Sequence, residues 1–300
     1  MDLSYHILPW RDNLVQTILL CYTLYGKEGK GMTLANYHTH TRMCDGNNTP
    51  EEMVGEALRQ GLKALGFSGH MDQDIHMDFP AYVREVRRLR EKYREKLDIL
   101  VGVELDALYR PETLEGAEYR IGSTHFLDVE TELDTGVDVS AENLRALTDQ
   151  CFGGDPYRMV RAYYALESQV VERTDCSFVG HFDLITRFND DMRLFDEEDR
   201  RYMDPALEAM EALCRKDVPF EINCGAFNRG RKRDLYPRQS LLRALHDFGG
   251  RILISSDAHD AAHLTGGFDT ARERASDAGF REVWYLRHEG NGVQWYAEAL

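Results

Sequence analysis

Two histidines stand one residue apart in the stretch 36–40, at the end of a short apolar run. Because residues i and i+2 of a strand point to the same face, the side chains of His38 and His40 can reach one metal ion together. Asp45 follows on the next loop, beside Gly46, which lets the chain turn. A His-x-His pair alone is a weak indication of a metal site, so the rest of the sequence has to decide.

The same pattern recurs along the chain, because short apolar runs end repeatedly in histidine, aspartate or glutamate. One such side chain is most simply a satisfied polar residue at a strand end. Many such side chains together would bury many polar groups without a partner, unless a metal ion is present. Imidazole and carboxylate suit Zn²⁺, Mn²⁺ or Fe²⁺ better than Ca²⁺, and so many ligands imply about two to three ions bridged by a carboxylate. The nine candidate ligands are His38, His40, Asp45, His70, Glu104, His125, His181, Asp257 and His259.

From Met32 onward, strand-like apolar runs alternate with helix-like runs. Each strand candidate is short, apolar and bounded by glycine or polar residues, as expected of a buried parallel strand. A capping box with proline at the first helical position, Thr49-Pro50-Glu51-Glu52, opens a helix through Arg59. Strands are expected over 34–37, 64–67, 99–103, 119–121, 177–179, 219–222, 252–254 and 283–286, and further helices over 82–96, 141–151, 156–174, 197–216, 237–248 and 270–278.

Repeated strand–helix units imply an α/β fold with a parallel sheet, either open or closed into a barrel. The candidate ligands favour the closed form, because each of them follows a strand candidate. In a (β/α) barrel the carboxyl ends of the strands converge on one rim, where active sites are built. The sequence therefore predicts a TIM-like barrel with a metal site at the C-terminal rim of its strands.

Residues 1–31 differ in character from the rest of the chain, and they end in a glycine- and lysine-rich run just before Met32. The run Lys27-Glu28-Gly29 can be encoded by codons that contain a purine-rich ribosome-binding sequence. Residues 1–31 are then a translated leader ahead of a natural start at Met32. The alternative is a true N-terminal helix over 12–25, and both interpretations stay open.

The composition, 43% hydrophobic and 29% charged, is typical of a globular protein. A net charge of -16 argues against a nucleic-acid backbone as the main partner and is compatible with a site that collects cations. Six scattered cysteines without a Cys-x-x-Cys pair suit a reducing cytoplasm better than a disulfide framework. No segment is apolar for long enough to span a bilayer, so a membrane partner is not expected.

In their order along the chain, these motifs resemble those of the polymerase and histidinol phosphatase (PHP) superfamily. The resemblance covers residues 32–300, which are expected to form one PHP-type phosphoesterase domain. The run 122–128, the helical insertion after it, and Phe220-Glu221-Ile222-Asn223 followed by Tyr236-Pro237 are similar to the histidinol-phosphatase branch. The resemblance implies a distorted (β/α)7 barrel that binds three divalent metal ions.

Carried over position by position, the resemblance also implies how the ligands divide among the ions. Glu104 would bridge two ions, and Glu104, Asp257, His125 and His181 would form the catalytic centre. The sequence departs from the family at Gly69, a position where the family often has aspartate. A carboxylate that could support His70 from behind is therefore missing. The first ion would take His38, His40, Glu104 and Asp257, the second Glu104, His125 and His181, and the third Asp45, His70 and His259.

The implied chemistry is hydrolysis of a phosphomonoester by a metal-activated hydroxide, since coordination lowers the pKa of water to roughly 7. Phosphate recognition also favours arginine, whose planar fork binds two oxygens at once. Arg187 and Arg229 follow strand ends and are the expected phosphate ligands. Arg231 and Arg233 are either further phosphate ligands or part of a solvated basic loop. No general acid is identified, although Asp183 is a candidate.

The substrate implied by this branch is L-histidinol phosphate, a small molecule of histidine biosynthesis. Its ammonium group suits the acid-rich loops around the expected rim, which contain Asp72, Asp74, Asp78 and Asp183. A broader phosphoesterase acting on nucleotides or other phosphate esters is the main alternative. A non-enzymatic PHP module such as that appended to DNA polymerases often loses ligands, whereas all nine positions are filled here. An amidohydrolase would require another histidine order. The oligomeric state stays open.

Overall fold

A computed structural model describes residues 34–75, 77–110, 114–290 and 292–300, all within one compact unit. The segment 1–31, with its expected helix over 12–25, lies outside the described residues. No helix in the described ranges is both long and apolar enough to cross a membrane.

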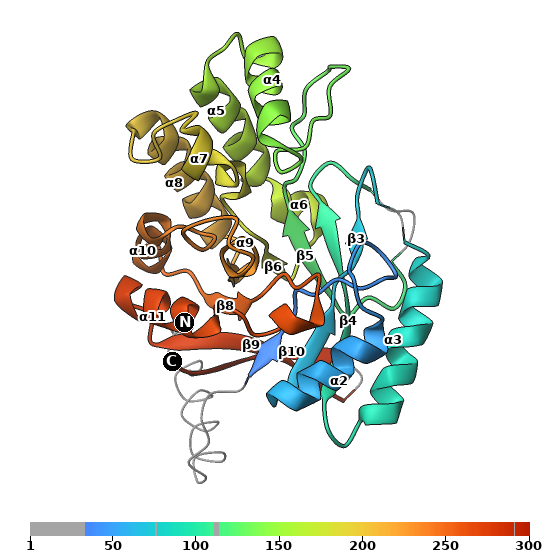
Figure 1. Cartoon of the computed structure of the whole chain (residues 1–300). Helices are drawn as coiled ribbons and strands as arrows, with labels where there is room; N and C mark the ends of the chain where they lie inside the picture. The colour runs from blue at the N-terminus through green and yellow to red at the C-terminus, as the bar shows by residue number, and fades with distance from the viewer. Residues whose placement is uncertain (1–33, 76, 111–113, 291) are drawn as a thin grey trace, which may run out of the picture. The chain divides into compact units, whose positions relative to one another are not determined.

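Seven parallel strands form a nearly closed barrel (Figure 1). The segments that follow the first and last strands meet at a parallel bridge between Thr39 and Ala258, where the His40 amide donates to the Ala258 carbonyl at 2.9 Å. The expected TIM-like barrel is therefore confirmed. Its strand order is β1 (Ala35–Asn36), β2 (Ala64–Phe67), β4 (Asp98–Asp106), β5 (Tyr119–Ser123), β6 (Phe178–Val179), β7 (Phe220–Asn223) and β8 (Ile252–Ser255), with the short β3 (His70–Met71) pairing with β4.

Tyr119 fills the interior of the barrel beneath the carboxyl ends of the strands. Its hydroxyl donates to the carbonyls of Tyr37 at 2.7 Å and Phe67 at 3.1 Å, so one side chain ties together β5 and the segments of β1 and β2. A Cβ atom at Gly102 would lie 2.0 Å from the ring carbon that carries this hydroxyl. Glycine is needed there because the tyrosine ring lies directly against the backbone.

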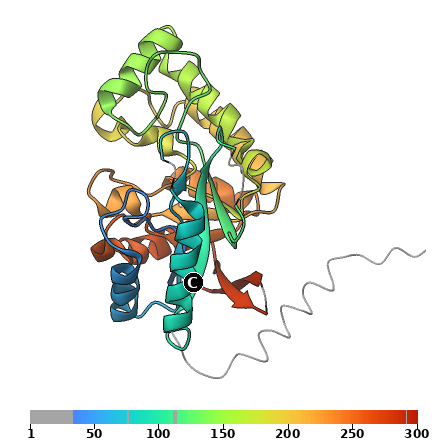
Figure 2. The ribbon, with the colours of Figure 1, turned by 90° about the vertical axis from the view of Figure 1, so that its right-hand side faces the viewer.

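Helices flank this barrel on both sides (Figure 1). The capping box at Thr49 is present as expected, and the helix that it opens packs with the next one beside β2 and β4. A helical lobe between β5 and β7 projects from the carboxyl end of the barrel, as Figure 2 also shows. The helices are α2 (Pro50–Gln60), α3 (Phe79–Tyr93), α4 (Ala141–Cys151), α5 (Pro156–Glu167), α6 (Val170–Thr174), η1 (Leu184–Thr186), α7 (Asn189–Met192), α8 (Arg200–Cys214), α9 (Gly225–Asn228), α10 (Gln239–Asp247), η2 (Ala261–His263) and α11 (Phe268–Ala278).

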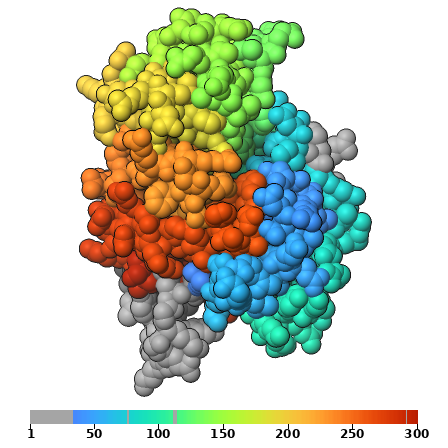
Figure 3. Space-filling model, viewed as in Figure 1, coloured from blue at the N-terminus to red at the C-terminus, as the bar shows by residue number. Residues whose placement is uncertain are grey.

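Segments far apart in the sequence meet on the face seen in Figure 3, where the blue N-terminal part lies against the orange C-terminal part. The Asn48 side chain accepts a hydrogen bond from the Ala261 amide at 2.9 Å, and the Asn47 amide donates to the His259 carbonyl at 2.7 Å. The loop that carries Asp45 is thereby held against the loop that carries His259.

The expectation of a buried parallel strand over 283–286 was wrong. These residues belong to β9 (Glu282–Glu289), which pairs antiparallel with β10 (Gly292–Ala299) outside the barrel sheet. Only Val283 and Leu286 of the run are buried, whereas Trp284 and Tyr285 are partly exposed, so the run lacks the continuous burial of a barrel strand. The expected helix over 156–174 is also divided, since α5 ends before Ser168 and α6 begins at Val170.

Candidate metal centre

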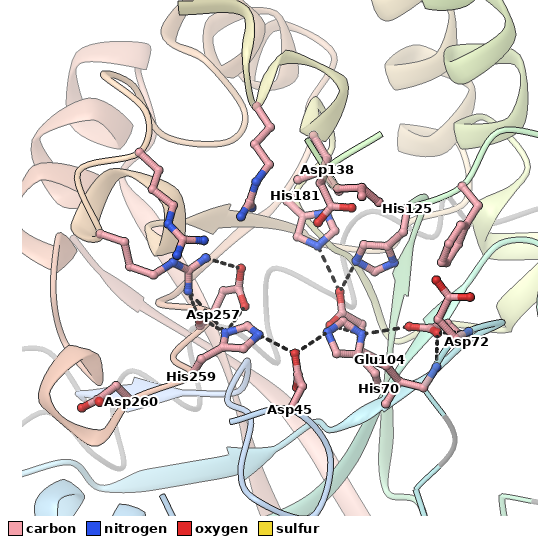
Figure 4. Close-up of a pocket in the computed structure, with 18 of the residues that line it drawn as sticks. Asp45, His70, Asp72, Glu104, His125, Asp138, His181, Asp257, His259 and Asp260 are labelled. Carbon is pink, nitrogen blue, oxygen red and sulfur yellow. Dashed lines mark hydrogen bonds and ion pairs between the residues drawn. The ribbon is translucent and has the colours of Figure 1, made fainter. Parts of the chain in front are cut away.

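The nine candidate ligands converge at the carboxyl ends of the strands, around one cavity of about 540 Å³ (Figure 4). Seven of them line the cavity, while His38 and His40 lie buried behind it with no exposed surface. The candidate ligands come from the ends of different strands, as a barrel rim requires. His38 and His40 follow β1, His70 begins β3, Glu104 lies in β4, His125 follows β5, His181 follows β6, and Asp257 and His259 follow β8.

Glu104 is the centre of this cluster. Its Oε1 lies 3.0 Å from His181 Nε2 and 3.3 Å from His125 Nε2. Its Oε2 lies 3.0 Å from the Nε2 atom of His38 and 3.4 Å from that of His40. The Ser123 hydroxyl donates to Oε1 at 2.7 Å. Two oxygens facing two separate sets of imidazoles give this carboxylate the geometry that a bridging ligand needs.

In the part of the chain that the structure describes, three groups of ligand atoms lie close enough together to hold an ion, each with its atoms within 4.8 Å of one another. The expected third set, Asp45, His70 and His259, falls in one group, which His40 joins. His40, His70 and Glu104 are each shared between two groups. The groups are His40, Asp45, His70 and His259; His38, His40 and Glu104; and His70, Glu104 and His125.

Asp257 and His181 stand outside these three groups but next to them. Asp257 Oδ1 lies 3.4 Å from His40 Nε2 and 3.7 Å from His38 Nε2, on the side expected for the first ion. His181 reaches the cluster through its 3.0 Å contact with Glu104. Asp257 also has a φ of 46°, in the left-handed region that non-glycine residues adopt infrequently.

Burial changes steadily across the cluster. The side chains of His38, His40 and Glu104 are at most 1% exposed, whereas those of Asp45 and His259 are 30% and 27% exposed. The cluster therefore has a deep end beneath Glu104 and a shallow end at the loop of Asp45.

The donor set fits divalent metal ions. Among the described residues, the Nε2 atom of His40 and the Nδ1 atom of His70 are buried without a hydrogen-bond partner. Both nitrogens lie 3.3–3.4 Å from Glu104 Oε2, at the places where two groups of ligand atoms overlap. Unpaired buried nitrogens are costly, and a metal ion accepts their lone pairs without a proton.

Electrostatics in the cluster keep its carboxylates ionised. Burial raises the pKa of Glu104, but the neighbouring histidines, His38 first among them, outweigh it and hold that pKa well below its usual range. Burial likewise raises the pKa of Asp257, and His38 and Arg229 reverse the effect. Burial lowers the pKa of His70 to about 3, so this imidazole is neutral and can donate its lone pair to a metal.

Sulfur atoms occupy the space beside Gly69, where the resemblance led us to expect aspartate. A Cβ atom at Gly69 would lie 2.8 Å from Met77 Sδ and 3.1 Å from Cys44 Sγ. The Cys44 thiol in turn donates to Asp45 Oδ1 at 3.1 Å. Met77 and Cys44 therefore occupy the space that a side chain at residue 69 would need.

Three arginines line the cavity: Arg187, Arg229 and Arg231. Arg229 is fixed in place, because it donates to the Asp257 carbonyl at 2.7 Å and lies 3.5 Å from Asp257 Oδ2. Burial lowers the pKa of Arg231, and so do the charges of Arg187 and Arg229. Of the two arginines left open by the sequence, Arg231 thus belongs to the cavity wall, whereas Arg233 is 76% exposed and faces Asp191.

The acids expected around the rim take different places. Asp72 and Asp74 line the cavity, whereas Asp78 caps α3 by accepting from the Ala81 amide. Asp183, the candidate general acid, is fully buried outside the cavity lining, and burial raises its pKa to about 7. The cavity has two further acids that the sequence did not single out, Asp138 and Asp260.

Sequence reasoning also missed two carboxylates that lie directly behind the ligands. Glu221 Oε2 lies 2.6 Å from His38 Nδ1, on the side of the ring away from Glu104. Asp106 accepts from the His125 amide at 2.7 Å. Each had a recognisable signal: Glu221 stands in a buried apolar strand, and Asp106 is two residues after Glu104 on one strand face.

Comparison with known proteins agrees with this geometry. The model of the PHP domain matches residues 36–225. A probable histidinol-phosphatase of Schizosaccharomyces pombe is 26% identical to this chain, over 81% of this chain and 86% of its own length. A probable histidinol-phosphatase of Deinococcus radiodurans is 27% identical, over 85% of this chain and 97% of its own length. The fold is that of histidinol phosphate phosphatase from Lactococcus lactis, whose structure was solved with zinc, L-histidinol and phosphate. The two structures superpose with a TM-score of 0.65 and share 21% sequence identity, over 88% of this chain and all of the other.

Proposed function

The chain belongs to the PHP family of phosphoesterases, and we propose that it is a metal-dependent phosphomonoesterase that hydrolyses L-histidinol phosphate to L-histidinol and phosphate. The observation that carries this proposal is Glu104, a buried carboxylate between two sets of imidazoles, facing a cavity that also holds three arginines. That arrangement provides cation ligands and phosphate ligands in one place.

We assign the ions to the sets that the family resemblance implies, with Glu104 shared between the first two. When bound, divalent ions lower the pKa of coordinated water to roughly 7 and so provide a nucleophile at neutral pH. The carboxylates of Asp45, Glu104 and Asp257 stay ionised and balance the charge of the cations. Three metal ions and these nine ligands are part of the proposal.

Arg187 and Arg229 would bind the phosphoryl oxygens and orient the ester for in-line attack. The new bond forms between the water oxygen and phosphorus, the ester P–O bond breaks, and the alcohol leaves with a proton. Charge builds up on the phosphoryl oxygens during this transfer, and a guanidinium held in place stabilises it without reorganising. Arg229 is so held, by the backbone and side chain of Asp257.

The remaining wall of the cavity suits a cationic leaving group with a flat apolar part. Figure 4 shows Asp138 beside His125 and His181, on the opposite side from Asp260. Phe126, Val139 and Leu184 add apolar surface to this wall. L-Histidinol carries an ammonium group and an imidazole ring, and the two sequence relatives described above are named probable histidinol-phosphatases.

A broader phosphoesterase is the second candidate, favoured by the third arginine, since Arg231 offers more positive charge than one monoester requires. A phosphate-release screen of the metal-loaded protein with histidinol phosphate, mononucleotides and a phosphotyrosine peptide tests both proposals. The first expects histidinol phosphate to be hydrolysed with the highest kcat/KM. A clear preference for mononucleotides would favour the second.

Metal content is the most direct test of the cluster. Protein purified without chelator is expected to carry about two to three equivalents of transition metal, measured by elemental analysis, because the ligand atoms suffice for that number. Removal of the metal by chelator should abolish phosphate release, and adding Mn²⁺ or Zn²⁺ back should restore it. Active enzyme without bound metal would contradict the proposed mechanism.

The arginines should act on the phosphate and not on the leaving group. Arg187→Ala and Arg229→Ala are each expected to lower kcat/KM by roughly tenfold to a hundredfold, the worth of one charge-assisted hydrogen bond. The loss should be similar for histidinol phosphate and p-nitrophenyl phosphate, since both contain the same phosphoryl group. Arg233→Ala, which changes an exposed arginine outside the cavity, is the matched control. A loss confined to one ester would show that the residue contacts the leaving group instead.

A further inference from the structure

Glu221 is a fully buried carboxylate in β7, in the middle of an apolar strand. Its Oε2 atom lies 2.6 Å from His38 Nδ1. Its Oε1 atom accepts hydrogen bonds from the His181 amide at 3.2 Å and from the Asn223 side chain. Both oxygens are thus used, and each one faces a donor of fixed position.

These contacts determine which nitrogen of His38 keeps its proton when an ion binds. A carboxylate only accepts, so the contact with Glu221 holds a proton on Nδ1, and Nε2, which faces Glu104 in the metal-free protein, is the nitrogen that can give up its proton and offer a lone pair. Nε2 is the atom that lies 3.0 Å from Glu104 and 3.7 Å from Asp257, among the groups that can hold an ion. Glu221 itself lies on the far side of the ring and is in none of these groups.

We propose that Glu221 is a positioning residue for the metal centre, which holds His38 in the tautomer and orientation that present Nε2 to the ion. The inference rests on the metal centre of the proposed function. A hydrogen bond from the second nitrogen of a ligating histidine to a carboxylate fixes the ring and makes its lone pair more basic. The His181 amide and Asn223 in turn hold the carboxylate of Glu221 in place.

Glu221→Gln is the informative change, because it keeps the shape but leaves only one acceptor oxygen. If that oxygen faces His38, the new NH₂ group meets the N–H groups of His181 and Asn223. If the amide is turned round, its NH₂ faces His38 Nδ1, and the imidazole must then carry its proton on Nε2. Either arrangement disturbs the ligand.

Glu118→Gln is the matched control. Glu118 also accepts from three groups, Arg90, the Val101 amide and His288, but it precedes β5 and therefore lies at the other end of the barrel. Both variants lose a carboxylate with several partners, and both should lower the melting temperature of the metal-free protein. Only Glu221→Gln should change metal binding.

The measurement is a titration of the metal-free, full-length protein with Co²⁺, followed by visible absorption. Glu221→Gln is expected to weaken the tightest Co²⁺ site by roughly tenfold to a hundredfold, whereas Glu118→Gln leaves it unchanged. In a His38→Gln background, the further change Glu221→Gln should have no additional effect on Co²⁺ affinity, because the effect passes through His38. Should Glu221→Gln not fold, Glu221→Asp keeps the charge but cannot reach both partners, and it should also weaken Co²⁺ binding.

If the folded Glu221 variant binds Co²⁺ with wild-type affinity, the inference is overturned. It is also overturned if Glu221→Gln lowers Co²⁺ affinity as much in the His38→Gln background as in the wild-type protein. These outcomes are separate from a failure of the proposed function. A protein that shows the expected Co²⁺ effects but hydrolyses no phosphate ester would contradict the function and leave the role of Glu221 intact.

Discussion

Glu104→Gln is expected to lower kcat by roughly a hundredfold to a thousandfold, the usual loss when one preorganised electrostatic group is removed from an active site. It should also remove at least one equivalent of bound metal. The reason lies in the position of this carboxylate, whose two oxygens face separate sets of imidazoles. Glutamine has the same shape but lacks the negative charge that holds two cations close together. The readouts are phosphate release under saturating substrate and elemental analysis of the purified variant.

The fold should survive this change, because the side chain keeps its volume and the core around Tyr119 is untouched. Circular dichroism of the variant checks this point, and Glu118→Gln provides the same substitution away from the cavity. Near-wild-type activity in Glu104→Gln would show that Glu104 is not the bridging ligand, and the division of the nine ligands would then have to be revised.

Histidinol phosphate is expected to exceed p-nitrophenyl phosphate in kcat/KM by roughly a hundredfold or more, although its leaving group is far poorer. The attack on phosphorus is alike for every monoester, so selectivity has to come from contacts with the leaving group in the transition state. One charge-assisted contact is worth about 1.5–3 kcal/mol, and the cavity has acids for two of them. Asp138 and Asp72 both line the cavity on the side of His125.

Asp138→Asn sharpens this comparison, because it removes one charge without touching a candidate ligand. It should lower kcat/KM for histidinol phosphate and leave p-nitrophenyl phosphate unaffected, so the gap between the two esters narrows. Equal or better turnover of aryl phosphates or mononucleotides by the unmodified protein would remove the histidinol assignment, while the metal centre would stand.

The sequence alone was enough to predict that the nine candidate ligands lie together. Parallel strands of a barrel end on one rim, so residues that directly follow strands must converge there even when the strand limits are off by a residue or two. β1, for example, is shorter than expected, yet His38 and His40 still lie on the rim behind the cavity. The expectation depended on the order of elements and not on their lengths.

Other features could not be read from the sequence, because they depend on distances between segments far apart along the chain. The run 283–286 is as short and apolar as a barrel strand, and nothing within it distinguishes the edge of a hairpin from a barrel interior. The role of Arg231 depends on how the loop after β7 folds back toward Arg187. Glu221 belongs to a motif that the sequence displays, but its contact with His38 spans 183 positions.

The change in burial across the cluster has a kinetic consequence. An ion held at the deep end, by His38, His40 and Glu104, would reach solvent only through the cavity that Glu104 lines, because His38 and His40 have no exposed surface. The ion near Asp45 and His259, whose side chains are the most exposed, would then exchange fastest with solvent, and the deepest ion slowest. A phosphate ester lying in the cavity would slow the escape of every ion beneath it.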